Sequence, residues 1–208
     1  LGAWRQAVGS LEAHRALGGG VEHLPVLMDS YRALRRYAAI EPLWEELREA
    51  SPSAALVARF EGAVECESHG QSVVYLDRAH LADAVAYLRA EEQFSMLMDV
   101  TAVDHLRDVE RLEVDGVTAE RFEVVVNLIS HPRNERIRLI CAVPEDDATV
   151  PSLTGTFPGA AFPEREVYDL MGIEFTDHPE LTRILMPDDW VGHPLRKDDL
   201  PARVPVTF

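Results

Sequence analysis

The sequence predicts an α+β fold, with a mainly antiparallel sheet, helices on one face, an N-terminal helical extension and an extended C-terminal tail. Apolar residues recur at steps of three and four in the first part of the chain, and at steps of two beyond it. Prolines crowd the end of the chain. We therefore expect a helical extension over 1–62, an α+β domain over 63–186 and a proline-rich tail over 187–208.

The N-terminal region is predicted to be helical. Trp4, Val8 and Leu11 have the spacing of one face of an amphipathic helix. The run 18–20 consists of glycines and separates this helix from a second one, around Leu27 and Tyr31. The region either packs on its own domain or lies as an arm on another protein, and the pattern favours neither.

Strands and one helix alternate in the next part of the chain. Residues 64–67 and 72–76 predict a hairpin, and Asp77 is expected to cap a helix over 78–90. Alternation returns over 94–100, where the methionines are expected to fill the core. The 144–162 segment reads as a linker. The two clearest strands lie before it, with their buried faces formed by Phe122, Val124, Val126, Leu128 and by Ile137, Leu139, Cys141, Val143.

Composition excludes several classes of function. A net charge of −16 argues against binding to nucleic acid or to anionic lipid, both of which require a basic surface. No apolar run approaches the roughly 20 residues of a membrane-spanning helix, and no signal pattern opens the chain, so we expect a cytoplasmic protein. Two cysteines, Cys66 and Cys141, are too few to ligate an iron–sulfur cluster.

The sequence offers no recognisable catalytic or metal-binding pattern. His178, Asp188, Asp189 and His193 are close in sequence, but they lack the spacing of a zinc site. Two glutamates at 164 and 166 point to different faces of a helix and form no acid–base pair. Nucleophile and phosphate-binding motifs are absent from the sequence. We therefore expect no catalytic, cofactor-binding or metal-binding residue in this chain.

Residues 164–198 form the densest stretch of charged, aromatic, Gly and Pro residues in the chain. Pro163 is expected in the first turn of a helix that ends at Gly172 in the left-handed conformation. Beyond it, His178-Pro179 and His193-Pro194 predict turns, and the prolines from Pro187 onward exclude regular structure. An extended segment cannot bury itself, so we interpret this stretch as a surface for docking on a partner.

This stretch resembles a known family. The motifs are ERExYDLxGIxF at 164–175, HPxLxRIL at 178–185 and GHPLRKD at 192–198. They resemble the signature of the C-type subunit, also known as the 30 kDa-type subunit, of bacterial NADH-quinone oxidoreductase, respiratory complex I. The similarity extends upstream through RFEVVVNL at 121–128 and covers roughly residues 64–198. Met171, Asp177 and Asp199 depart from the residues common in the family.

The resemblance implies an accessory, cofactor-free subunit in the peripheral arm of a proton-pumping NADH:quinone oxidoreductase. Electrons would pass from NADH through FMN and iron–sulfur clusters in other subunits to quinone, on the cytoplasmic side of the bacterial cell membrane. The implied partners are the homologue of the D-type subunit, which the tail wraps, and the homologues of the B-type and I-type subunits. The implied interface residues are Glu164, Arg165, Glu166, Tyr168, Asp169, Gly172, His178, Pro179, Arg183, His193, Pro194, Leu195, Arg196, Lys197 and Asp198.

Two alternatives stay open at this point. The first is the equivalent subunit of a membrane-bound nickel–iron hydrogenase or of a formate hydrogenlyase, from the same superfamily. The second is a free-standing, metal-dependent enzyme that uses His178 and His193.

Overall fold

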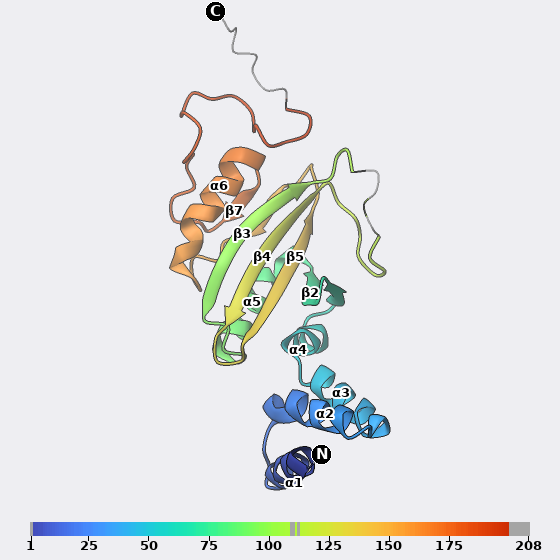
Figure 1. The fold of residues 1–208 in the computed structure, drawn as a ribbon. Coiled ribbons are helices and arrows are strands. Elements are labelled where there is room, and N and C mark those ends of the chain that lie inside the picture. The colour runs from blue at the N-terminus through green and yellow to red at the C-terminus, as the bar shows by residue number, and fades with distance from the viewer. Residues whose placement is uncertain (1, 109–110, 112, 200–208) are drawn as a thin grey trace, which may run out of the picture. The chain divides into compact units, whose positions relative to one another are not determined.

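The computed structural model describes residues 2–108, 111 and 113–199, and the chain forms two compact units, Leu1–Ala55 and Leu56–Phe208 (Figure 1). The first unit is helical. It contains α1 (Gly2–Ala16), η1 (Val21–His23), α2 (Leu24–Ala33), η2 (Tyr37–Ala39) and α3 (Glu41–Glu49). Helix α4 (Pro52–Arg59) spans the division between the units.

The N-terminal unit has a small hydrophobic core of its own. The core is built mainly from α2, and its buried members are Val8, Leu24, Leu27, Met28, Tyr31 and Leu43. The expected apolar face of the first helix is narrower than predicted, because Val8 is buried whereas Trp4 is 44% exposed.

A five-stranded sheet forms the centre of the second unit. Its strands are β1 (Val64–Ser68), β2 (Gln71–Leu76), β3 (Met96–Asp104), β4 (Phe122–Ser130) and β5 (Glu135–Val143), in the order β1-β2-β5-β4-β3. The pair β2–β5 is parallel, and the other pairs are antiparallel. The predicted α+β class with a mainly antiparallel sheet is therefore confirmed.

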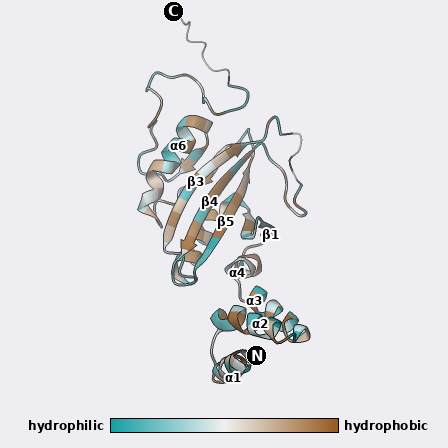
Figure 2. Cartoon of the chain, viewed as in Figure 1, coloured by the Kyte–Doolittle hydropathy of each residue, from teal (hydrophilic) through white to brown (hydrophobic). Residues whose placement is uncertain are grey.

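One face of the sheet carries the core. Every second residue of β4, and of β5 from Ile137 onward, is buried, as their alternation predicts, and both strands carry hydrophobic segments in Figure 2. Helix α5 (Leu81–Ala90) and helix α6 (Ala161–Met171) contribute Val85, Leu88, Val167 and Met171 to the same core. The predicted cap is also confirmed, since the Asp77 carboxylate accepts the Ala79 N–H at 2.8 Å, at the start of η3 (Arg78–His80).

The cysteines lie on different strands of the sheet. Cys141 on β5 is fully buried, and burial raises the pKa of its thiol to about 12. Cys66 on β1 is partly buried, and burial raises its pKa as well. Burial therefore disfavours the thiolate form of both groups.

Two expectations for this unit are wrong. Met96 and Met98 are 43% and 49% exposed, so they do not fill the core. The segment expected to be a linker contains β6 (Thr149–Pro151) and η4 (Pro158–Ala160), and β6 pairs in parallel with β7 (Glu174–Thr176). Strands this short carry too few residues for a period of two to be recognised in the sequence.

The central strands set the stability of the second unit. Leu139 on β5 is fully buried, so Leu139→Ala should lower the free energy of unfolding by about 2–5 kcal/mol. Leu185→Ala, at a side chain that is 58% exposed, should change it by less than about 0.5 kcal/mol. Urea denaturation followed by circular dichroism measures both, and equal effects would contradict this assignment of the core.

Candidate subunit interface

The stretch that follows β7 folds back onto its own domain. We call residues 177–199 the strap; they contain no helix or strand, as predicted for the part from Pro187. The strap passes the C-terminal end of α6 and reaches the end of β3, and Figure 1 draws it in orange and red beyond α6. The remainder of the predicted tail, 200–208, lies outside the described residues.

Asp169 fastens the middle of the strap. Its side chain is fully buried on α6, and its Oδ2 accepts the backbone N–H groups of the strap at 2.7 to 3.0 Å. Those donors belong to Ile184, Leu185 and Met186. Arg183 donates to the other carboxylate oxygen at 2.6 Å. Burial alone would raise the pKa of Asp169, but these donors outweigh it and hold the pKa at about 2.

The strap also satisfies the carbonyl groups that α6 leaves free at its C-terminal end. His193 Nδ1 donates to the Asp169 carbonyl at 3.0 Å. The Leu195 N–H donates to the Leu170 carbonyl at 3.0 Å. Arg196 Nε donates to the Met171 carbonyl at 2.6 Å, and its Nη2 donates to the carbonyl of Gly172 at 3.2 Å. A helix end needs such donors, and its negative dipole favours cations such as Arg196.

Gly172 lets the strap come this close. It ends α6 with a φ of 69°, in the left-handed conformation that the sequence predicts. A Cβ at this position would lie 2.5 Å from His193 Nε2 and 2.7 Å from Arg196 Nη2. The glycine therefore serves both the turn of the backbone and the packing of the strap.

An ion-pair cluster around the buried side chains of Arg121 and Asp104 holds the far end of the strap. Arg121, just before β4, pairs with Asp104 at the end of β3 at 2.9 Å, and also with Asp198 of the strap. The Asp104 carboxylate accepts the Lys197 N–H at 2.8 Å. Burial opposes ionisation of Asp104, but Arg121 and the N–H groups of Lys197 and Leu106 lower its pKa to about 2. The Asp104 side chain is fully buried.

Glu164 and His178 have structural roles in this arrangement. Glu164 lies buried near the start of α6 and accepts from the Ser152 hydroxyl and the Leu153 N–H, both at 2.7 Å. Burial raises its pKa despite these donors. His178 donates from Nε2 to the Ala161 carbonyl at 3.1 Å, and its Nδ1 accepts the Glu180 N–H at 3.0 Å. Both ring nitrogens of His178 therefore have protein partners.

The other predicted interface residues divide between inward and outward positions. Arg165 donates to the carbonyls of Thr182 and Arg183 at 3.0 Å and so holds the start of the strap. Glu166, Pro179 and the Lys197 side chain are exposed, and Tyr168 and Pro194 are partly buried. The predicted interface residues thus lie together around α6, and most of their contacts are made within the domain.

Some residues of this surface are not predicted from the sequence. Large apolar side chains point outward from the strap: Leu185 is 58% exposed, Val191 92% and Leu195 51%. Asp104 and Arg121 were not predicted as site residues. Their proximity follows from the β3–β4 register, in which Asp104 lies opposite Phe122. The pairing is a contact across the sheet that a reading along the chain does not reveal.

Comparison with known proteins decides the family. Residues 74–203 match the family described as the 30 Kd subunit of the respiratory-chain NADH dehydrogenase. The chain belongs to this family. It is accordingly a C-type subunit of NADH-quinone oxidoreductase, a component of the peripheral arm of complex I in the respiratory chain.

Individual relatives agree with this assignment. The C-type subunit of NADH-quinone oxidoreductase from Geobacter sulfurreducens is 44% identical over 132 residues, which are 64% of this chain and 76% of the relative. The fused C/D-type subunit of Methylococcus capsulatus is 42% identical over 154 residues, 72% of this chain. Those residues make up 26% of the longer C/D protein.

Solved structures show the same fold. A trypsin-resistant fragment of Nqo5, residues 1–134, superposes with a TM-score of 0.52 at 31% identity and covers 68% of this chain and 98% of the fragment. A chain of a membrane-bound sulfane sulfur reductase, an archaeal respiratory complex, has a TM-score of 0.51 at 21% identity, over 70% of this chain and 81% of that one.

The two functions of Gly172 can be separated with a matched glycine. Gly70 in the β1–β2 turn has a φ of 75°, but nothing lies within 4 Å of its added Cβ. Both Gly→Ala substitutions incur the left-handed penalty of about 1–2 kcal/mol. Gly172→Ala should also lose strap hydrogen bonds worth about 1 kcal/mol each. Chemical denaturation and trypsin cleavage within the strap measure this, and equal losses in both variants would contradict it.

Acid should release the strap. Because the folded pKa of Asp169 is about 2 and the ordinary value is about 4, its contribution is complete above pH 4 and is lost as the pH falls towards 2. Trp190 lies on the strap, so its fluorescence should change in this window in a Trp4→Phe, Trp44→Phe background. Asp169→Asn should show the change already at neutral pH.

The control for this titration is Asp188→Asn, at an exposed strap position. It should leave the transition unchanged. A transition completed above pH 4.5, or one that Asp169→Asn does not move, would contradict the assigned role of Asp169.

Proposed function

We propose that the chain is a cofactor-free docking subunit of complex I, and that the outward side of its strap binds the homologue of the D-type subunit. Electron transfer from NADH through FMN and iron–sulfur clusters to quinone would then take place in the partner subunits. The observation that carries this proposal is the combination of a firmly anchored strap with large, exposed apolar side chains on its outer side.

The anchored side explains the residues that the family signature shares with this chain. Asp169, Gly172 and Arg196 hold the strap in one conformation, so little conformational entropy would be lost on docking. The signature residues would thus shape the surface, and Leu185, Val191 and Leu195 would make the apolar contacts. Exposed apolar groups that cluster on one segment are typical of protein–protein interfaces.

Fused relatives support the D-type subunit as the occupant. In Methylococcus capsulatus and in Shewanella oneidensis the similar sequence is part of a longer protein whose name combines the C and D subunits. A fusion keeps its two parts close together and in equal number, as stable neighbours in a complex require. We extend the proposal to contacts with the homologues of the B-type and I-type subunits and to a place on the cytoplasmic side of the membrane.

The site chemistry supports a role without a cofactor. Cys66 and Cys141 lie on separate strands, where burial raises the pKa of both thiols, and the ring nitrogens of His178 bind protein groups. No helix in the described part of the chain is long and apolar enough to cross a membrane. These features agree with a subunit that joins the complex through protein contacts.

Binding to the purified D-type homologue tests the proposal. Leu185→Glu together with Val191→Glu should weaken binding at least tenfold, roughly 1.4 kcal/mol or more, because charged groups would face an apolar surface. Leu17→Glu is the control, since Leu17 is 89% exposed in the N-terminal unit. The affinities are measured by biolayer interferometry.

Two outcomes would contradict the proposal. One is unchanged affinity of the double variant for the D-type homologue. The other is that the tagged chain isolated from its cells carries nickel and hydrogen-evolving activity in place of flavin and NADH dehydrogenase activity.

A further inference from the structure

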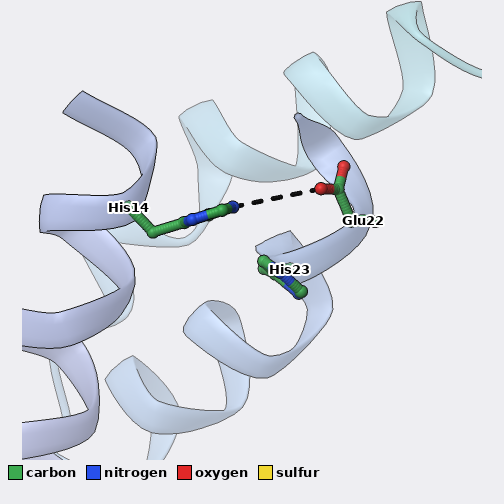
Figure 3. Close-up of side chains that lie close together, drawn as sticks. All are labelled: His14, Glu22 and His23. Carbon is green, nitrogen blue, oxygen red and sulfur yellow. Dashed lines mark ion pairs between the residues drawn. The ribbon is translucent and has the colours of Figure 1, made fainter. Parts of the chain in front are cut away.

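Two histidines and a glutamate come together at the junction of α1 and η1, within the N-terminal unit (Figure 3). We propose that His14, Glu22 and His23 form a binding site for a divalent transition-metal ion, with Zn²⁺ as its representative. The proposal concerns a part of the chain that the docking surface does not include, and it holds or fails independently of docking.

The three side chains already face one another. One ligand atom from each residue can be chosen so that all of them lie within 4.8 Å of one another. His14 Nε2 is 4.0 Å from Glu22 Oε1. The imidazole rings of His14 and His23 have their centroids 4.7 Å apart and are tilted by 58°. Figure 3 shows the His14 ring directed at the carboxylate of Glu22, with His23 beside them.

A small contraction would bring these atoms to coordination distance. Zinc binds imidazole nitrogen and carboxylate oxygen at about 2.0–2.2 Å, which places neighbouring tetrahedral ligands about 3.3 Å apart. The side chains of His14, Glu22 and His23 are exposed, so they can close this gap by rotating.

The backbone is held in place by the end of α1. The Gly19 N–H donates to the His14 carbonyl at 3.1 Å, and the Gly18 N–H donates to the Arg15 carbonyl at 3.0 Å. Gly18 has a φ of +87°. This pair of bonds with a left-handed glycine is the Schellman motif, which reverses the chain after a helix. It carries residues 19–23 back towards His14.

Two glycines leave room for the ligands. A Cβ on Gly19 would lie 2.3 Å from the His14 ring, and a Cβ on Gly20 would lie 2.3 Å from the Glu22 carboxylate. The glycines at 19 and 20 therefore leave the space that these two side chains occupy. The site also lies at the C-terminal end of α1, where the helix dipole favours a cation.

The ligand set determines the class of ion. Imidazole prefers zinc, copper and nickel, whereas magnesium and calcium prefer sets made of oxygen alone. Three protein ligands leave a fourth tetrahedral position for water. The bound ion would connect the last turn of α1 to the segment that enters α2, and it would stabilise the turn between them.

Calorimetric titration of the full chain with Zn²⁺ tests the site. The protein is freed of affinity tags, treated with a chelator and titrated with zinc chloride at pH 7.5. We expect one ion per chain, with at least about tenfold weaker binding in His14→Ala, His23→Ala and Glu22→Gln. Magnesium chloride should give no such binding.

Matched variants separate the site from adventitious binding. Gly19→Ala should weaken zinc binding, whereas Gly9→Ala should not, because nothing lies within 4 Å of an added Cβ at Gly9. His131→Ala removes an exposed histidine elsewhere and should have no effect. In the unmutated chain, zinc should shift the NMR signals of the His14 and His23 rings, and this readout does not depend on any variant being folded.

Several results would overturn the proposal. One is the absence of saturable one-to-one binding. Another is a zinc affinity of the His14→Ala and His23→Ala variants equal to that of the unmutated chain. The third is that the ring signals stay in place when zinc is added. Each would show that these residues form an ordinary surface ion pair and ring contact. None would affect docking of the strap on the D-type homologue.

Discussion

The C-terminal end of α6 is the constraint on which the candidate interface depends. A helix that ends inside a domain leaves carbonyl groups without partners, and burying them without donors costs free energy. Here the donors come from the strap, through His193, Leu195 and Arg196. In the opposite sense, the Asp169 carboxylate on α6 accepts hydrogen bonds from backbone N–H groups of the strap. The helix end and the strap therefore supply each other's hydrogen-bond partners.

These mutual hydrogen bonds change the interpretation of the family motifs. From the sequence, their density of special residues indicates a surface for a partner. In the structure most of their polar groups bind one another, as Arg183 binds Asp169 and Arg165 binds the carbonyl of Thr182. An irregular segment needs such fixed partners to hold one shape. A preformed shape then leaves the outward apolar side chains free to contact another subunit.

The sequence predicts a structural feature correctly where the residues that determine it are close together along the chain. The cap at Asp77, the left-handed Gly172 and the alternation of β4 and β5 all follow from local chemistry. The sequence does not predict features that depend on tertiary contacts. Met98 alternates like a core residue, yet it faces outward from β3, where the register shifts between Leu97 and Asp99. The partners of Arg121 depend on strand pairing and on a strap far along the chain, which no local pattern specifies.

The Arg121 cluster shows why the strap has a defined register. Burying Asp104 and Arg121 carries a desolvation cost, but their pairing and the N–H groups of Lys197 and Leu106 keep Asp104 ionised, with a pKa of about 2. The cluster also ties the strap to the ends of β3 and β4 through Lys197 and Asp198. A slip by one residue would move the Lys197 N–H away from Asp104 and Asp198 away from Arg121, so each buried group would lose one of its partners. These contacts and those of Asp169 favour the conformation in which Leu185 and Leu195 are exposed.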